Sequence, residues 1–169
     1  IPISGYGLNC LFVPERRNYA VVSTREGSLE VYHVGSGTAV GVVNKAHDGA
    51  VWSITWSSKS NADTGEFSLI SGGADKCVKF WKFDEYGEPT SNGSTGCLTL
   101  ERTLELTDDI LCVRTSPDGR FLFASLLDGT VRSFYLDTLK PFASFYGHKL
   151  PVLSMDISDD NQMLVTASA

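Results

Sequence analysis

Short apolar-rich runs separated by polar turns recur along the whole chain. The runs are six to nine residues long, and Gly, Asn, Asp or Pro stands in most of the turns between them. Such runs are typical of β-strands, and glycine gives a turn the backbone freedom that it needs. No segment shows sustained helical periodicity. The pattern therefore predicts an all-β fold.

One apolar strand template occurs four times, which indicates an internal repeat. The template begins at four positions: Gly7, Val51, Ile110 and Val152. The spacings are 44, 59 and 42 residues, and this period is typical of a β-propeller built from four-stranded sheets, or blades. The predicted repeats are 7–45, 46–106, 107–146 and 147–169, the last with two strands. We expect about three and a half blades of a larger protein, because a lone blade cannot bury its own faces.

The long second spacing comes from two polar stretches between strands. Lys59–Glu66 and Asp84–Cys97 are rich in Gly, Ser, Thr, Asn and Pro, a composition typical of surface loops. In contrast, Phe121–Leu127 is almost entirely apolar. This composition predicts a strand buried on both faces between neighbouring blades.

The second repeat carries a set of polar and aromatic side chains that resembles the tetrad of a WD repeat. The set is His47, Ser71, Asp75 and Trp81, within a segment Ala46–Phe83 that resembles one complete WD repeat. The resemblance implies a relay in which Asp75 accepts from His47, His47 meets Ser71, and Ser71 meets the Trp81 indole nitrogen. Such a relay gives a buried imidazole and a buried indole N–H their hydrogen-bond partners.

A Ser, a His and an Asp also suggest a hydrolytic triad, which is the alternative interpretation of the same residues. Ser71 lies inside a predicted strand rather than on a sharp strand-to-helix turn, and no oxyanion-hole loop accompanies it. The acidic residues Glu26, Asp75 and Asp128 all occupy turns between the second and third strands of their repeats. The sequence therefore favours a structural tetrad, and we expect no catalytic residues.

The other repeats keep only part of the tetrad. The expected partial set is His148 and Thr166 in the fourth repeat and Asp128 in the third. Other residue types stand at the remaining tetrad positions: Glu26, Tyr32, Asp108, Ala124 and Phe134. Since WD repeats often lack tetrad members, these departures leave the predicted fold unchanged.

The composition of the chain argues against nucleic acid, metal ions and membranes as direct partners. The chain has a net charge of −6, from 20 acidic and 14 basic residues, which argues against nucleic-acid binding through bulk charge. The four cysteines lack the C-x-x-C pairing of a zinc site. The longest stretch without a charged residue has 14 residues, fewer than the roughly 20 of a membrane-spanning helix. We expect no metal, cofactor, small-molecule substrate or membrane contact.

Longer stretches of sequence resemble one particular family. They are Asp48–Trp52, Gly72–Trp81, Asp109–Cys112, Phe134–Lys140, Ser144–Val152 and Met155–Ser158. They are similar to nucleolar proteins called WD-repeat protein three in animals and U-three-protein twelve in yeast. The likeness covers about two thirds of the chain, from Asp48 to Ser158. The run Tyr146–Val152 is more specific than a generic Gly-His pair.

The family resemblance implies a long subunit with two tandem propellers, of which this chain would be a part of the second. It implies a non-catalytic scaffold in the small-subunit processome, the snoRNP particle that processes pre-18S rRNA during ribosome biogenesis. The expected partners are other processome proteins, with U-three snoRNA and pre-rRNA contacted through the assembled particle. The expected location is the nucleolus. A generic WD-repeat adaptor in ubiquitin ligation or signalling is the alternative.

Overall fold

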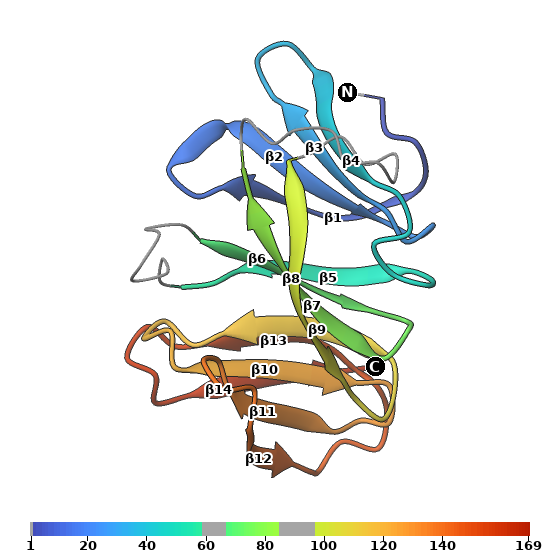
Figure 1. Ribbon diagram of the computed structural model, residues 1–169. Helices are drawn as coiled ribbons and strands as arrows, with labels where there is room; N and C mark the ends of the chain where they lie inside the picture. The colour runs from blue at the N-terminus through green and yellow to red at the C-terminus, as the bar shows by residue number, and fades with distance from the viewer. Residues whose placement is uncertain (1, 59–66, 85–96) are drawn as a thin grey trace.

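The structure is a computed structural model that describes residues 2–58, 67–84 and 97–169. These residues form fourteen β-strands and no helix, in three four-stranded sheets and one two-stranded sheet (Figure 1). Each sheet is antiparallel, and its strands follow one another in chain order. The expectation of an all-β fold is confirmed.

The strands overlap the apolar runs of the sequence, with ends that differ by at most three residues. The first sheet contains β1 (Gly7–Val13), β2 (Arg16–Thr24), β3 (Leu29–His33) and β4 (Thr38–Val43). The second contains β5 (Val51–Trp56), β6 (Ser68–Gly73), β7 (Cys77–Phe83) and β8 (Leu98–Glu105). The third contains β9 (Ile110–Thr115), β10 (Phe121–Leu126), β11 (Val131–Tyr135) and β12 (Pro141–Phe145). The fourth contains β13 (Val152–Ile157) and β14 (Leu164–Ser168). We call these sheets blades one to four.

The first strand of each blade lies toward a common axis. β5 lies beside β1 and β9, and β9 lies beside β13, whereas each later strand lies farther out in its own sheet. This arrangement is that of consecutive propeller blades.

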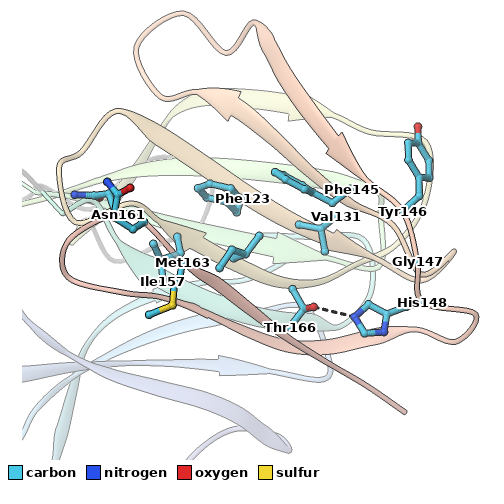
Figure 2. A pocket seen from close by; sticks show the side chains of 12 residues that line it. Phe123, Val131, Phe145, Tyr146, Gly147, His148, Ile157, Asn161, Met163 and Thr166 are labelled. Carbon is cyan, nitrogen blue, oxygen red and sulfur yellow. Dashed lines mark hydrogen bonds between the residues drawn. The ribbon is translucent and has the colours of Figure 1, made fainter.

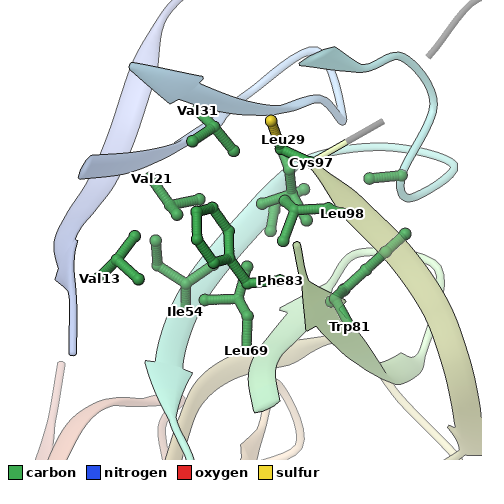
Figure 3. Close-up of a cluster of buried hydrophobic side chains, with 12 residues drawn as sticks. Val13, Val21, Leu29, Val31, Ile54, Leu69, Trp81, Phe83, Cys97 and Leu98 are labelled. Carbon is green, nitrogen blue, oxygen red and sulfur yellow. The ribbon is translucent and has the colours of Figure 1, made fainter. Parts of the chain in front are cut away.

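Apolar side chains between neighbouring blades form the core. Figure 3 shows the cluster between blades one and two, which includes Val21, Leu29, Ile54, Leu69 and Trp81. A second cluster joins blades two and three: Ile70, Val78, Phe80, Ile110, Val113, Leu122, Ala124, Leu126 and Phe134. A smaller cluster joins blades three and four: Cys112, Val131, Val152 and Met155. Each interface is thus formed by residues far apart in sequence.

The strand that we expected to be buried on both faces is fully buried on one face and only partly on the other, where Ser125 is buried. In β10, Leu122 is fully buried, but Phe121 and Phe123 on the opposite face remain half-buried. Phe121 contacts Phe142 with ring centroids 4.6 Å apart, and Phe142 is 52% exposed. Within residues 2–58, 67–84 and 97–169, the strands beside this aromatic face are β13 and β14, and β13 covers its inner part.

The turn between the second and third strands of one blade contacts the connector that leads into the next blade. Gly27 has a φ of 89°, and the backbone N–H of His47 donates to its carbonyl at 3.1 Å. A Cβ added to Gly27 would lie 2.5 Å from the carbonyl oxygen of His47, so a side chain does not fit there. Lys76 has a similar φ of 64° in blade two, and its carbonyl accepts from the N–H of Leu106 at 2.8 Å. We call each such contact an inter-blade clasp.

The two long polar stretches that we predicted as surface loops lie mostly outside the described residues. Of Asp84–Cys97, the structure describes the two end residues, and the N–H of Asp84 donates to the carbonyl of Cys97 at 3.0 Å. Lys59–Glu66 lies outside the described residues altogether.

Candidate functional site

The structure brings the four tetrad side chains of blade two into one line of hydrogen bonds. The ring atom Nδ1 of His47 lies 2.7 Å from Oδ1 of Asp75, and Nε2 lies 2.7 Å from Oγ of Ser71. The indole nitrogen of Trp81 donates to the same Ser71 oxygen at 2.8 Å. Four segments supply these residues: the connector before β5, strand β6, the β6–β7 turn and strand β7.

The chemistry of the indole sets the direction of every proton in this relay. An indole N–H can only donate, so Ser71 Oγ must accept from Trp81 and must direct its own proton elsewhere. The remaining partner is Nε2 of His47, which is therefore an unprotonated acceptor. The imidazole then carries its proton on Nδ1 and donates it to Asp75. The relay as a whole requires a neutral His47.

Burial supports the same protonation state. His47 is 1% exposed and Ser71 is fully buried. Burial lowers the pKa of His47 below its ordinary value of 6.5, and the neighbouring Asp75 offsets this only in part. Burial raises the pKa of Asp75, but hydrogen bonds from His47, from the Asp48 backbone and from Lys79 outweigh it, so the net pKa is lowered. The favoured state is a neutral imidazole beside an ionised carboxylate.

A fifth residue, Lys79 in β7, completes the relay and was not anticipated from the sequence. Its Nζ donates to Oδ2 of Asp75 at 3.1 Å and to the carbonyl of Ala46 at 2.7 Å. Lys79 therefore ties the β6–β7 turn to the connector that precedes His47. The available signal was a lysine four residues after the tetrad aspartate, on a strand whose alternate side chains are buried.

Blade two should lose stability as the pH falls below about 6.5, the ordinary pKa of histidine. Because the pKa of His47 is lower in the folded state than its ordinary 6.5, the unfolded chain takes up the proton first. The contribution of neutral His47 is thus fully present above about pH 6.5 and is lost as the pH falls below it. Amide hydrogen exchange over residues 68–83, measured in the full-length protein and corrected for the intrinsic rate, should report this. A His47→Asn variant whose pH dependence equals that of the parent would contradict the prediction.

The partial tetrad of the later repeats is only partly assembled. His148 Nε2 lies 2.8 Å from Thr166 Oγ1, at one end of a groove of about 590 Å³ between blades three and four (Figure 2). Asp128 does not join this pair. Its carboxylate accepts from the Thr130 backbone at 2.8 Å and from the Thr130 hydroxyl at 2.6 Å, so it closes its own turn.

In residues 2–58, 67–84 and 97–169, no three His, Cys, Asp or Glu side chains come together in a group that could hold a metal ion. The four cysteines are free thiols; Cys112 is buried, as expected for an apolar strand, but Cys10 is exposed. No helix in the described part of the chain is long and apolar enough to cross a membrane.

Comparison with known proteins decides between the WD-repeat families. The whole chain, residues 1–169, matches the sequence model of the WDR3 second beta-propeller domain. The chain belongs to this family. The resemblance seen in Asp48–Ser158 and the assignment to the second propeller are therefore confirmed.

The chain is also similar in sequence to three named proteins. The chain is 45% identical over 157 residues to "U3 small nucleolar RNA-associated protein 12" of Saccharomyces cerevisiae, a match that covers 90% of this chain. It is 45% and 44% identical to "WD repeat-containing protein 3" of Mus musculus and Homo sapiens, each over 87% of the chain. The chain spans only 15–16% of the length of these relatives.

Blade one of this chain replaces the tetrad with a different buried network. Glu30 in β3 is 1% exposed, and its carboxylate accepts hydrogen bonds from the hydroxyls of Ser4, Ser28 and Tyr32. Burial raises the pKa of Glu30, but these hydrogen bonds outweigh it and keep the pKa below its usual value. The expected substitute, Glu26, instead accepts from the backbone N–H of Tyr6 at 3.0 Å. Sequence reasoning missed Glu30 because it considered only tetrad positions.

Proposed function

We propose that this chain is part of a non-catalytic scaffold of the small-subunit processome and acts in pre-18S rRNA processing. The match of the whole chain to the WDR3 second propeller carries the proposal. A relative 45% identical to the chain is named for its association with the U3 small nucleolar RNA. In this proposal the protein works in the nucleolus as a subunit that assembles ribosomal precursors.

The burial of the relay supports a role without catalysis. A serine nucleophile must reach a substrate carbonyl, and its hydrogen bond to the base must be free to pass a proton. Ser71 is fully buried, and its oxygen already accepts from the Trp81 indole. The hydrogen bonds that join Ser71, His47 and Asp75 therefore stabilise the blade, although their distances resemble those of a catalytic triad.

The surface chemistry supports attachment through proteins rather than direct binding of RNA. With a net charge of −6, the chain offers few cations for phosphate contacts. Apolar side chains are instead exposed at the second residue of β1, β5 and β13, the first strands of blades one, two and four. These residues are Leu8, Trp52 and Leu153. Exposed aromatic and aliphatic side chains are typical anchors of protein interfaces. We infer that U3 RNA and pre-rRNA are reached through the assembled particle.

Affinity purification of the full-length protein tests the proposal. The tagged protein should concentrate in the nucleolus and co-purify with U3 RNA, and its depletion should leave pre-18S rRNA uncleaved. A wash of rising salt concentration serves as a control on the mode of attachment. If protein neighbours make the link, RNA recovery should fall in step with recovery of those proteins, without the steep salt loss of direct phosphate binding.

Other results would favour the alternative. A cytoplasmic protein that purified with a ubiquitin ligase or a signalling complex, and without pre-ribosomal RNA, would identify it as a generic WD-repeat adaptor. Hydrolytic activity abolished by Ser71→Ala in a variant with an unchanged melting profile would contradict the non-catalytic role.

A further inference from the structure

A groove of about 510 Å³ lies where the outer strands of blades two and three meet. The end of β8 and the connector that follows form one wall, and β11 and β12 form the other. Half-buried leucines line part of it, including Leu104, Leu106 and Leu139. The groove is therefore an apolar trough that runs beside the outermost strand of blade three.

One cation lies in this groove with a buried donor that has no partner. Arg132 is on β11, and it shares the face of Ala124 and Ser144, with which it is paired in the sheet. Its Nε atom is buried, and no atom of the described residues accepts a hydrogen bond from it. A buried donor without an acceptor is costly, and a charged donor more so.

The same position has partners in the other two complete blades: Lys79 in blade two and, four residues after Glu26, Glu30 in blade one. Arg132 comes four residues after Asp128, just as Lys79 comes four residues after Asp75. Lys79 donates both to Asp75 and to the connector carbonyl of Ala46. In blade three, the Asp128 carboxylate is instead bonded to Thr130, and no ion pair or hydrogen bond of the Arg132 side chain is found in the described chain. Arg132 therefore has the position of a blade anchor but lacks its acceptor.

A carboxylate is the group that fits this cation, because the half-buried Arg132 side chain lines the groove although its Nε atom is out of reach. The guanidinium presents N–H groups in a planar fork that matches the two oxygens of Asp or Glu. The leucines beside it would accept an apolar side chain of the same segment, and Ser144 on the exposed strand β12 offers a further polar contact. Glu105 also lines the groove and repels any anion there. The repulsion is larger for a polyphosphate backbone, with a negative charge at every nucleotide, than for a peptide with a single carboxylate.

We propose that this groove binds an extended peptide of a partner protein, in which an Asp or Glu pairs with Arg132 and a neighbouring apolar side chain packs on Leu106 and Leu139. The proposal rests on the proposed function of this chain as a scaffold that binds other proteins, and it specifies the chemistry of one such partner. RNA is the competing occupant, and the test below distinguishes it.

The probes are fluorescein-labelled ten-residue peptides, in which one Asp or Glu is flanked by Leu, Ile or Val in each arrangement. Each peptide has a twin with Asn or Gln at the acidic position. Binding to the full-length protein is followed by fluorescence anisotropy. We expect saturable binding by at least one acidic peptide, and an affinity about tenfold weaker for its amide twin, because a charge-assisted pair is lost.

Three variants of the full-length protein complete the design. Arg132→Gln should weaken the acidic peptide about tenfold and leave the amide twin unchanged. Arg132→Lys retains the charge without the fork and should recover part of the affinity. Lys140→Gln is the matched control, since it removes one exposed charge beside the groove and should not change binding. Amide exchange over β10 and β11 verifies that each variant remains folded.

Two outcomes would overturn the proposal. In the first, no acidic peptide of the set binds more tightly than its amide twin, or the acidic peptide binds the Arg132→Gln variant as tightly as the parent. The other is a single-stranded RNA twelvemer that binds with the same dependence on Arg132. Neither outcome bears on processome membership, which the co-purification tests separately.

Discussion

Replacing Trp81 with alanine is expected to destabilise blade two by about 3–5 kcal/mol, the usual cost of removing a large buried aromatic side chain. Trp81 is 3% exposed and packs in the core between blades one and two. The change also removes the donor to Ser71 Oγ, so a buried hydroxyl loses a partner. Amide hydrogen exchange over residues 68–83 in the full-length protein measures the loss where it arises.

Trp81→Phe is the matched control for this prediction. Phenylalanine already stands at the corresponding position of blade three, Phe134, where Ala124 replaces the tetrad serine. The Phe variant keeps most of the buried apolar area but loses the indole hydrogen bond, so its loss should be closer to about 1–2 kcal/mol. Equal exchange in the parent and the Ala variant would show that Trp81 does not support the blade.

Replacing Gly73 with alanine should cost about 1–3 kcal/mol, even though the change adds a single methyl group. The new Cβ would lie 2.4 Å from Nδ1 and 2.7 Å from Cγ of His47, and 3.0 Å from Oδ1 of Asp75. The ring cannot turn aside, because hydrogen bonds anchor both of its nitrogens. The space that a side chain would take at Gly73 is already filled by the imidazole.

A double-mutant cycle isolates this cause. Thr24 and Leu126 stand at the corresponding positions of blades one and three, which have no histidine at the tetrad position, and both are fully buried. His47→Ala alone should cost about 1–3 kcal/mol, since Ser71 and Asp75 lose a partner. In the His47→Ala background, Gly73→Ala should cost much less, with a coupling of about 0.5–3 kcal/mol. Additive losses would contradict the steric explanation.

Much of the fold could be predicted because it depends on short-range patterning. Apolar runs such as Val51–Ser57 and the turns between them specify strands locally. The four tetrad residues could be proposed because the segment Ala46–Phe83 resembles a complete WD repeat. The half-buried state of Phe121 and Phe123 could not, because burial depends on how many strands the next blade places against that face.

Residues that bind segments distant in sequence were not predictable for a related reason. Lys79 reaches the connector at Ala46, and Glu30 meets Ser4, so each interaction joins segments more than 25 residues apart. A charged residue on an alternating strand looks like a solvent-facing one until its neighbouring segment is known. The unpartnered Nε of Arg132 depends on Asp128 bonding to Thr130, and that choice of partner is fixed only in the folded turn.

The inter-blade clasp leaves just one end of the blades tolerant of added sequence. At the end where Gly27 meets the connector at His47, two backbones touch, and an inserted residue would separate them. The opposite end carries the connections between the first and second strands and between the third and fourth strands of each blade. Both long connections of blade two, from β5 to β6 and from β7 to β8, leave from that opposite end. Lineages can therefore lengthen these connections, and an experimenter can place a tag in them, while the joints between blades stay unchanged.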